Sequence, residues 1–268
     1  MENKYLKQYL TDNLRALQCK ELEILKEIDR ICRKHNIDYW LDGGTCLGAV
    51  RHGGFIPWDD DIDIAMRKED LARFEIVAPR ELPPHLFLQT QESDPSRRLP
   101  ITKVRDLNSY CVEAMDDFTQ PYQKGVFVDI FPFINYPDVS RQFVKTVVGG
   151  INKSMAVLSA KHTYSWRSVA EFFYFHAKKL LLMMLWRSAN LLRNTDTYMC
   201  NILVNNGYGI THRKDCIFPT KDILFEGIPF KAPRQPDIYL TDLYKDYMQL
   251  PPVDKRKVHG IFFMTDLV

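Results

Sequence analysis

Four aspartates lie within five positions of one another, at Asp59, Asp60, Asp61 and Asp63. On a β-strand, side chains two residues apart share a face, so Asp61 and Asp63 are expected to project together. Adjacent carboxylates repel each other unless a cation neutralises them, and hard oxygen ligands suit Mg²⁺ or Mn²⁺. A solvated acidic turn is the alternative, whereas the Gly and Glu positions of an EF-hand calcium loop are missing. The spacing predicts a metal site at Asp61 and Asp63, with Asp59 as a further ligand.

A pair of glycines, Gly43-Gly44, lies ahead of the acidic run, between a short apolar segment and a short helical one. Glycine lets backbone N–H groups approach an anion closely, and the N-terminus of the following helix adds positive potential. A glycine pair alone is more often a plain turn. The order strand, Gly-Gly, helix, loop and Asp-x-Asp strand is far more specific. It predicts a phosphate-binding turn at Gly43, Gly44 and Thr45 beside the metal site.

A later acid, Asp129, lies inside the otherwise apolar segment 125–131, which is typical of a buried strand. A strand-end aspartate that caps a turn is the alternative interpretation. Because Asp61 and Asp63 already predict a metal site, we expect Asp129 to be its third carboxylate.

Basic residues accompany these acids at two places. Lys103 and Arg105 share one face of a predicted strand, where they would clamp phosphate oxygens or form a solvated basic edge. Arg51 and His52 follow the short helix after the glycine pair, where they would reach a phosphate or cap the C-terminus of that helix.

The elements that position these residues alternate between helix and strand up to about residue 136. The segment from about 139 to 205 then lacks proline and is predicted to be helical, and strands return from Cys216 onward. The pattern predicts an α/β (α+β) fold, a mixed sheet with an added helical segment. We expect a catalytic core at 1–136, a helical insertion at 137–210 and a return to the core at 211–268.

Composition restricts the function classes. The 268 residues are 46% hydrophobic and 26% charged with a net charge of +2, which predicts a globular protein and no nucleic-acid partner. Six scattered cysteines and no apolar leader predict a cytoplasmic location. Lys178 and Lys179 in the middle of the apolar stretch 170–192 exclude a membrane span there. That stretch would instead lie on a membrane surface or pack on the core.

The motifs in their order resemble the LicD-type phosphocholine transferases and, more distantly, the fukutin-type ribitol-phosphate transferases. The resemblance covers roughly 20–135 and 215–260, and it departs from the family at Lys245, where a glycine is expected. The residues that carry it are Asp42-Gly43-Gly44-Thr45, Leu47 to His52, Gly54 to Asp63, Lys103 to Asp106, Val128 to Pro132, Phe225 to Gly227, Tyr244 to Tyr247, and Leu250 to Pro252.

The resemblance implies a nucleotidyltransferase-like core and a metal-dependent phosphotransferase. Such an enzyme moves phosphocholine, or a related phospho-alcohol, from a CDP-activated donor such as CDP-choline to a hydroxyl of a cell-surface glycan. Lipopolysaccharide, teichoic acid and capsule are such acceptors, and a lipid-linked acceptor would place the protein at the inner face of the membrane, in peripheral contact with it. Asp61 and Asp63 would hold Mg²⁺ or Mn²⁺, and Asp129 would complete the site or act as the base.

Two other functions stay open at the level of sequence. The same carboxylates would serve nucleotidyl transfer to a small molecule or a protein. A catalytically silent fold that acts as a binding subunit is the other alternative, and the presence of all three acids argues against it.

Overall fold

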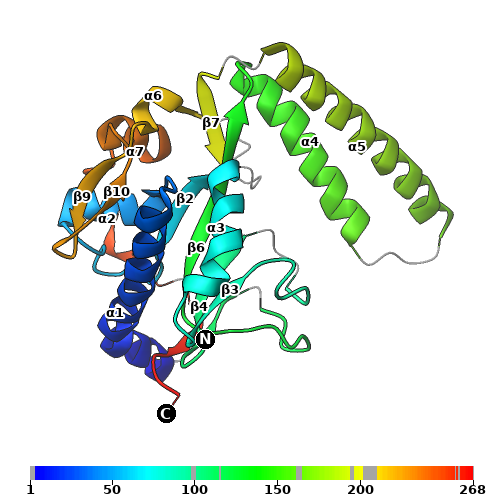
Figure 1. The fold of residues 1–268 in the computed structure, drawn as a ribbon. Helices are drawn as coiled ribbons and strands as arrows, with labels where there is room; N and C mark the ends of the chain where they lie inside the picture. The colour runs from blue at the N-terminus through cyan, green and yellow to red at the C-terminus, as the bar shows by residue number, and fades with distance from the viewer. Residues whose placement is uncertain are drawn as a thin grey trace. The chain divides into compact units, whose positions relative to one another are not determined.

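The computed structural model describes residues 4–97, 101–114, 116–160, 165–193, 196–201, 210–256, 258 and 260–267. The chain divides into two compact units, one made of Met1–Pro132 and Cys216–Val268 and the other of Phe133–Asp215. Helices and strands alternate along the first unit around a mixed sheet, which confirms the predicted fold class (Figure 1).

The central sheet of the first unit is built from short strands with buried β-branched and aliphatic side chains. The pairs β1–β2, β3–β4 and β4–β6 are antiparallel, and β2 lies between β1 and β6. Asp63 on β2 and Asp129 on β6 therefore lie on neighbouring strands. In sheet order the strands are β1 (Trp40–Leu41), β2 (Asp63–Arg67), β6 (Phe127–Tyr136), β4 (Thr102–Asp106) and β3 (Leu86–Gln89).

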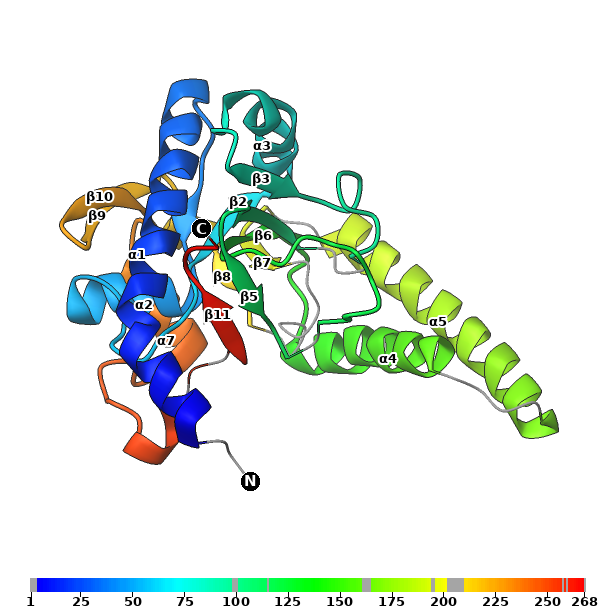
Figure 2. The same cartoon turned by 90° about the horizontal axis from the view of Figure 1, so that it is seen from below.

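Two long helices of the first unit, α1 (Lys4–His35) and α3 (Lys68–Glu81), contact each other beside this sheet (Figure 1). The apolar stripe of α1 continues N-terminally beyond the predicted range of 19–35, because Leu14 and Leu17 are also buried. Strand β11 (Phe262–Met264) pairs with β5 (Tyr110–Val112) and contacts α1 (Figure 2). The C-terminal segment thus returns to the first unit.

A second layer of the first unit consists of α2 (Gly43–His52), α7 (Pro236–Tyr244) and the hairpin of β9 (Lys221–Phe225) and β10 (Ile228–Ala232). Helix α2 contacts both α7 and β9. The C-terminal return from Cys216 begins with a short helix, α6 (Lys214–Ile217), and not with the strand that we predicted. A single turn of 3₁₀ helix, η2 (Val253–Lys255), follows α7.

The second unit contains α4 (Arg141–Ser159) and α5 (Trp166–Arg193), which pack against each other. Within this unit the last residues of β6 pair with β7 (Tyr198–Asn201), which pairs with β8 (His212–Arg213). The prediction of helix as far as residue 205 is therefore wrong at 198–201, and its last part, 202–205, lies outside the described residues. In the part of the chain that the structure describes, no helix is both long and apolar enough to cross a membrane.

Strand β6 also runs four residues beyond Pro132, where we expected it to end. Proline removes a backbone donor, and it interrupts a strand where a ladder hydrogen bond needs that donor. The recorded pairing of β6 with β4 ends at Ile130, and its pairing with β7 begins at Phe133. Pro132 lies between the two ladders, so its missing N–H costs neither of them a hydrogen bond.

Candidate active site

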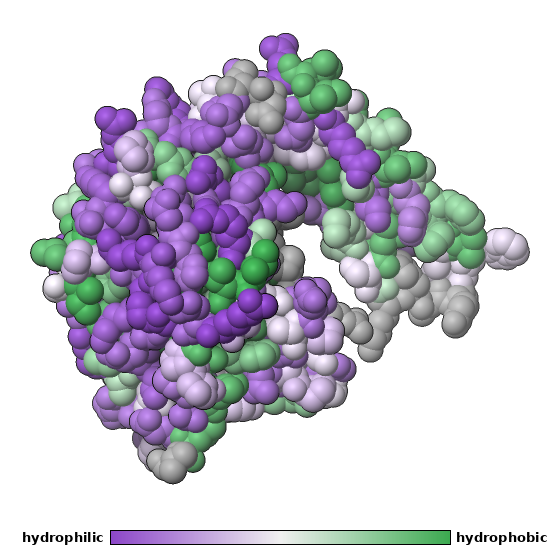
Figure 3. Space-filling model, in the orientation of Figure 1, coloured by the Kyte–Doolittle hydropathy of each residue, from purple (hydrophilic) through white to green (hydrophobic). Residues whose placement is uncertain are grey.

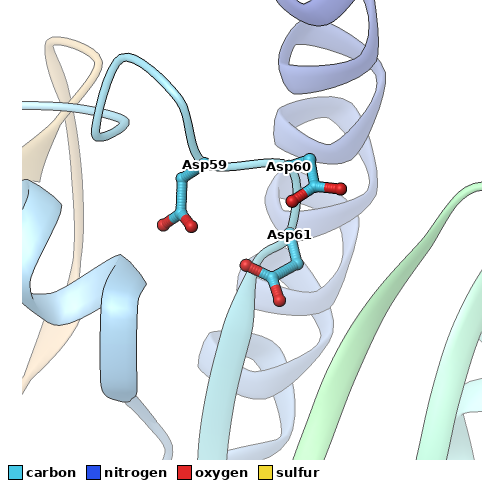
Figure 4. A group of neighbouring side chains, drawn as sticks. All are labelled: Asp59, Asp60 and Asp61. Carbon is cyan, nitrogen blue, oxygen red and sulfur yellow. The ribbon is translucent and has the colours of Figure 1, made fainter. Parts of the chain in front are cut away.

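The acidic run lies on the loop that enters β2, with α1 beside it (Figure 4). One carboxylate oxygen from each of Asp59, Asp60 and Asp61 lies within 4.8 Å of the others. Gln18 of α1 donates to the backbone carbonyl of Asp59 at 2.9 Å, and the backbone N–H of Gly260 donates to the Asp60 carboxylate at 2.5 Å. The loop is thus held on both sides, and the three carboxylates converge.

A cavity of about 400 Å³ opens beside this loop. The carboxylates of Asp59, Asp61 and Asp63 contribute to its wall. Asp61 and Asp63 thus face one cavity as expected, but only Asp63 lies on a strand, since β2 begins there. Another part of the lining comes from the end of α7 and the segment that follows it, more than 180 residues later in the chain. The lining is completed by Gly44, Leu47, Arg51, Ile56, Trp58, Tyr244, Asp246, Tyr247, Gln249 and Pro251.

The electrostatics of these carboxylates favour a bound cation. Burial, with the charges of Asp61 and Asp129, raises the pKa of Asp63 well above its ordinary value. Burial, with the charges of Asp61 and Asp60, raises the pKa of Asp59 to about 8. A proton is retained when the anionic form lacks solvation or a positive partner, and a divalent cation would supply that partner. The donor set of clustered carboxylate oxygens fits Mg²⁺ or Mn²⁺.

One further acid faces the same cluster and was missed by our reading of the sequence. Glu21 of α1 is 1% exposed, and its Oε2 atom has no hydrogen-bond partner among the described residues. Burial, followed by the charges of Asp61 and Asp60, raises its pKa well above the ordinary value. The signal was present in the sequence, because Glu21 interrupts the apolar face of α1 between Leu17 and Ile24.

The glycine pair brings the start of α2 against these acids. Gly43 adopts a left-handed backbone with φ of 49°, which favours glycine. A Cβ atom on Gly44 would lie 2.8 Å from Oδ2 of Asp59, so a side chain there would displace this carboxylate. Thr45 has a structural role that we did not predict, because its hydroxyl accepts a hydrogen bond from the Asp63 N–H at 2.8 Å. Contact of this turn with a phosphate remains a prediction.

Asp129 lies next to the acidic run, as we expected. Its backbone N–H donates to the carbonyl of Ile62 at 3.0 Å, and its charge contributes to the raised pKa of Asp63. It already has a cationic neighbour, however, because Nζ of Lys103 lies 2.8 Å from its Oδ1 atom. Lys103 is directly opposite Asp129 in the β4–β6 ladder.

Lys103 and Arg105 are fully buried, so their interpretation as a solvated basic edge is wrong. Both cations bind Glu113, Lys103 at 2.9 Å and Arg105 at 3.0 Å, and both lie over the ring of Phe127. Burial of a charged strand edge is possible here because each cation has carboxylate and aromatic partners. Their use as a phosphate clamp stays a prediction. In the structure they bind carboxylates.

Arg51 and His52 differ in what they contact. The Nη1 atom of Arg51 donates to the carbonyl of Tyr247 at 2.7 Å, and its side chain lines the cavity. His52 lies edge-on to Trp58, and burial followed by the charge of Arg51 lowers its pKa. The left-handed residue Gly53 ends α2. The structure thus brings Arg51 to the cavity, whereas contact of either residue with a phosphate remains untested.

Two tyrosines of the C-terminal return also belong to the site, although we gave them no role from sequence. The hydroxyl of Tyr239 donates to Oδ1 of Asp42 at 2.5 Å, which fixes the carboxylate that caps α2. Tyr244 lines the cavity, and burial followed by the charges of Asp42 and Asp63 raises its pKa. Only three-dimensional proximity assigns these roles, because both residues lie about 200 positions from their partners.

The amino-acid sequence is also similar to those of known proteins. Residues 36–148 match the family model described as LicD/FKTN/FKRP, nucleotidyltransferase domain. The lipopolysaccharide cholinephosphotransferase LicD of Haemophilus influenzae is 28% identical over 269 residues, which cover 92% of this chain and 96% of that protein. The ribitol 5-phosphate transferase FKRP of Homo sapiens is 40% identical over 62 residues, 23% of this chain and 12% of that protein. The ribitol-5-phosphate transferase FKTN of Mus musculus is 30% identical over 95 residues, 33% and 21% of the two chains.

Proposed function

The chain carries a nucleotidyltransferase domain of the LicD family, and on this premise we propose that it is a phosphotransferase acting on a glycan. The donor is a CDP-alcohol, with CDP-choline as the first choice, and the acceptor is a hydroxyl of a cell-surface glycan such as lipopolysaccharide. One observation carries the proposal. The cavity is lined both by residues inside the matched domain and by Tyr244 to Pro251 beyond it, and the likeness to the cholinephosphotransferase extends over 92% of the chain.

The reaction needs charge neutralisation and alignment more than covalent help from the protein. The acceptor oxygen forms a bond to the phosphorus that bears the alcohol, the bond from this phosphorus to the bridging oxygen breaks, and CMP leaves with that oxygen. Asp59, Asp61 and Asp63 would hold Mg²⁺ or Mn²⁺, which when bound supplies the positive charge that neutralises the pyrophosphate.

The residues of the chain have distinct roles in this proposal. The N-terminus of α2 faces the pyrophosphate with the backbone N–H groups of Gly44 and Thr45, since the N–H of Gly43 already donates to Asp42. Arg51, held by the carbonyl of Tyr247, offers a guanidinium to phosphate oxygens within the cavity. Asp129 accepts the proton of the acceptor hydroxyl, and Lys103, 2.8 Å from its Oδ1 atom, orients this carboxylate.

The experiment identifies the leaving group, because phospho-alcohol transfer releases CMP and nucleotidyl transfer releases pyrophosphate. The purified protein is incubated with Mg²⁺ and lipopolysaccharide together with CDP-choline, CDP-ribitol, CTP or ATP, and all products are measured by mass spectrometry. We expect CMP and phosphocholine-modified glycan from CDP-choline. Asp61→Asn serves as the inactive variant, and Asp254→Asn, an exposed aspartate of η2, serves as the control with the same change of charge.

Each other outcome has a defined meaning. Pyrophosphate from CTP or ATP, with no CMP from either CDP-alcohol, would assign the site to nucleotidyl transfer. Absence of turnover together with a donor-induced rise in melting temperature would indicate a binding subunit. Full activity of Asp61→Asn, or of the wild type in excess EDTA, would refute the metal-dependent mechanism.

A further inference from the structure

Positive charge is concentrated in the segment 141–193, called here the helical hairpin, which contains α4 and α5. This segment has nine Lys and Arg residues and a single acid, Glu171, so its net charge is +8. The whole chain carries +2, and the residues outside the hairpin therefore carry −6. The one acid is already paired, since Glu171 binds Arg167 at 3.0 Å. The hairpin thus presents a strongly basic surface.

The helix α5 also exposes an unusual amount of apolar surface. Its exposed aromatic and aliphatic residues recur at steps of seven and four residues, which place them on one helix face. Green and purple alternate along this part of the molecule in Figure 3. The α5 stripe, as we call it, consists of Trp166, Phe173, Leu180, Met184 and Leu191, with Tyr174, Leu181, Leu185 and Leu192 next to them.

A different face of α5 is already used for packing within its unit. Leu182 lies so close to α4 that a Cβ atom on Gly150 would be 2.5 Å from its Cδ1 atom. Trp186 packs on Tyr136 with a ring-centroid distance of 4.9 Å, next to the buried Val144. The α5 stripe therefore lies on a face of the helix other than the one that packs against α4. Trp166 is 90% exposed, and contiguous apolar surface of this kind marks an interaction site.

Basic residues lie at the edges of the stripe. At 100° per residue Lys178 and Arg187 lie at the two edges of the stripe, and Lys178 lies over the ring of Tyr174 at 5.7 Å, whereas Lys179 lies on the opposite face. A helix with aromatic and aliphatic residues on one face and Lys or Arg beside them lies in the interface of a membrane, with its cations at the lipid phosphates. No described helix meets the requirements for a membrane span. A contact of α5 with a membrane would therefore place the helix in the plane of the surface.

We propose that the α5 stripe inserts into the headgroup region of a membrane that contains anionic lipids, and that Lys178 and Arg187 contact the lipid phosphates. The charge selects this occupant. A second copy of the chain docked hairpin to hairpin would bring +8 against +8, and a nucleic acid would leave the aliphatic side chains in water. The proposal rests on the hairpin alone and does not depend on the reaction that the cavity catalyses.

The test is flotation of the full-length protein with vesicles of phosphatidylcholine alone or with about a third phosphatidylglycerol, at low and high salt. We expect binding to the anionic vesicles, weakened by salt. Each basic residue near such a surface contributes about fivefold to partitioning, so Lys178→Glu with Arg187→Glu should lower binding by roughly 25-fold or more. The control is Lys68→Glu with Arg80→Glu, the same change of charge on exposed residues of α3. It should leave binding unchanged.

A second pair of variants tests the apolar part. Leu180→Ser should weaken vesicle binding several-fold, whereas Ile76→Ser, which alters a comparably exposed side chain on α3, should not. Circular dichroism verifies that each variant is folded, and light scattering records its oligomeric state. Three results would each overturn the proposal: no flotation of the wild type with anionic vesicles at low salt, equal loss in the α3 controls, or a dimer that Leu180→Ser dissociates.

Discussion

Replacing Asp61 by asparagine removes one charge from the acidic run and keeps a side chain of the same shape. The carboxylate oxygens of Asp59, Asp60 and Asp61 lie within 4.8 Å of one another. At this separation two like charges repel by about 3 kcal/mol at an effective dielectric constant near 20, and by about 1 kcal/mol in water. We expect the metal-free variant to be more stable than the wild type by about 1–3 kcal/mol. For a chain of this length that raises the melting temperature by roughly 3–10 °C.

The assay is thermal unfolding at about pH 9, above the pKa of Asp59, so that this carboxylate is ionised in the wild type. Each protein is measured in EDTA and in saturating Mg²⁺. A ligand at 100 times its dissociation constant stabilises by about 2.7 kcal/mol, so Mg²⁺ should raise the melting temperature of the wild type and have little effect on Asp61→Asn. Asp254→Asn should behave as the wild type in both conditions. A variant that melts at or below the wild-type temperature in EDTA, and that gains as much from Mg²⁺, would refute this reasoning.

Three further predictions concern the same unit. The pKa of Asp59 is raised in the folded protein, so without metal the stability should fall as the pH rises from about 5 to about 8; Asp59→Asn should flatten this dependence in thermal unfolding curves. Glu21→Gln should raise the metal-free melting temperature by a few degrees, because it removes a buried acid whose Oε2 atom lacks a partner among the described residues; a lower temperature would show that its charge is stabilising. Lys103→Met should lower the free energy of unfolding, measured in urea, by about 3–5 kcal/mol, because Asp129 and Glu113 lose their shared cation. The control, Lys26→Met on the surface, should lower it by less than about 1 kcal/mol.

The parts of the site that lie close together in sequence could be predicted, because local geometry determines them. Asp61 and Asp63 share one wall of the cavity, as their spacing predicted, although β2 begins only at Asp63 and Asp61 lies on the loop before it. The glycine pair likewise marked the start of α2, since a left-handed residue there favours glycine.

The parts that depend on distant segments could not be predicted in this way. Lys103 and Arg105 look like a solvated edge in sequence, and their burial depends on Glu113 and Phe127, which reach them only through the fold. The role of Tyr239 depends on Asp42, which lies 197 positions away. Sequence patterns report on neighbours within a helix or strand, whereas these contacts arise from the tertiary arrangement.

The two walls of the cavity are made at very different times during synthesis of the chain. The acids and the glycine pair leave the ribosome early, and the second unit, Phe133–Asp215, is translated before Tyr244 and Pro251 follow. A nascent chain that stops at residue 215 has the clustered carboxylates but neither Tyr239 to hold Asp42 nor the segment that faces them. The site is therefore completed only once residues 239–251 have been translated, and truncations that stop before residue 239 should be inactive however well the earlier part folds.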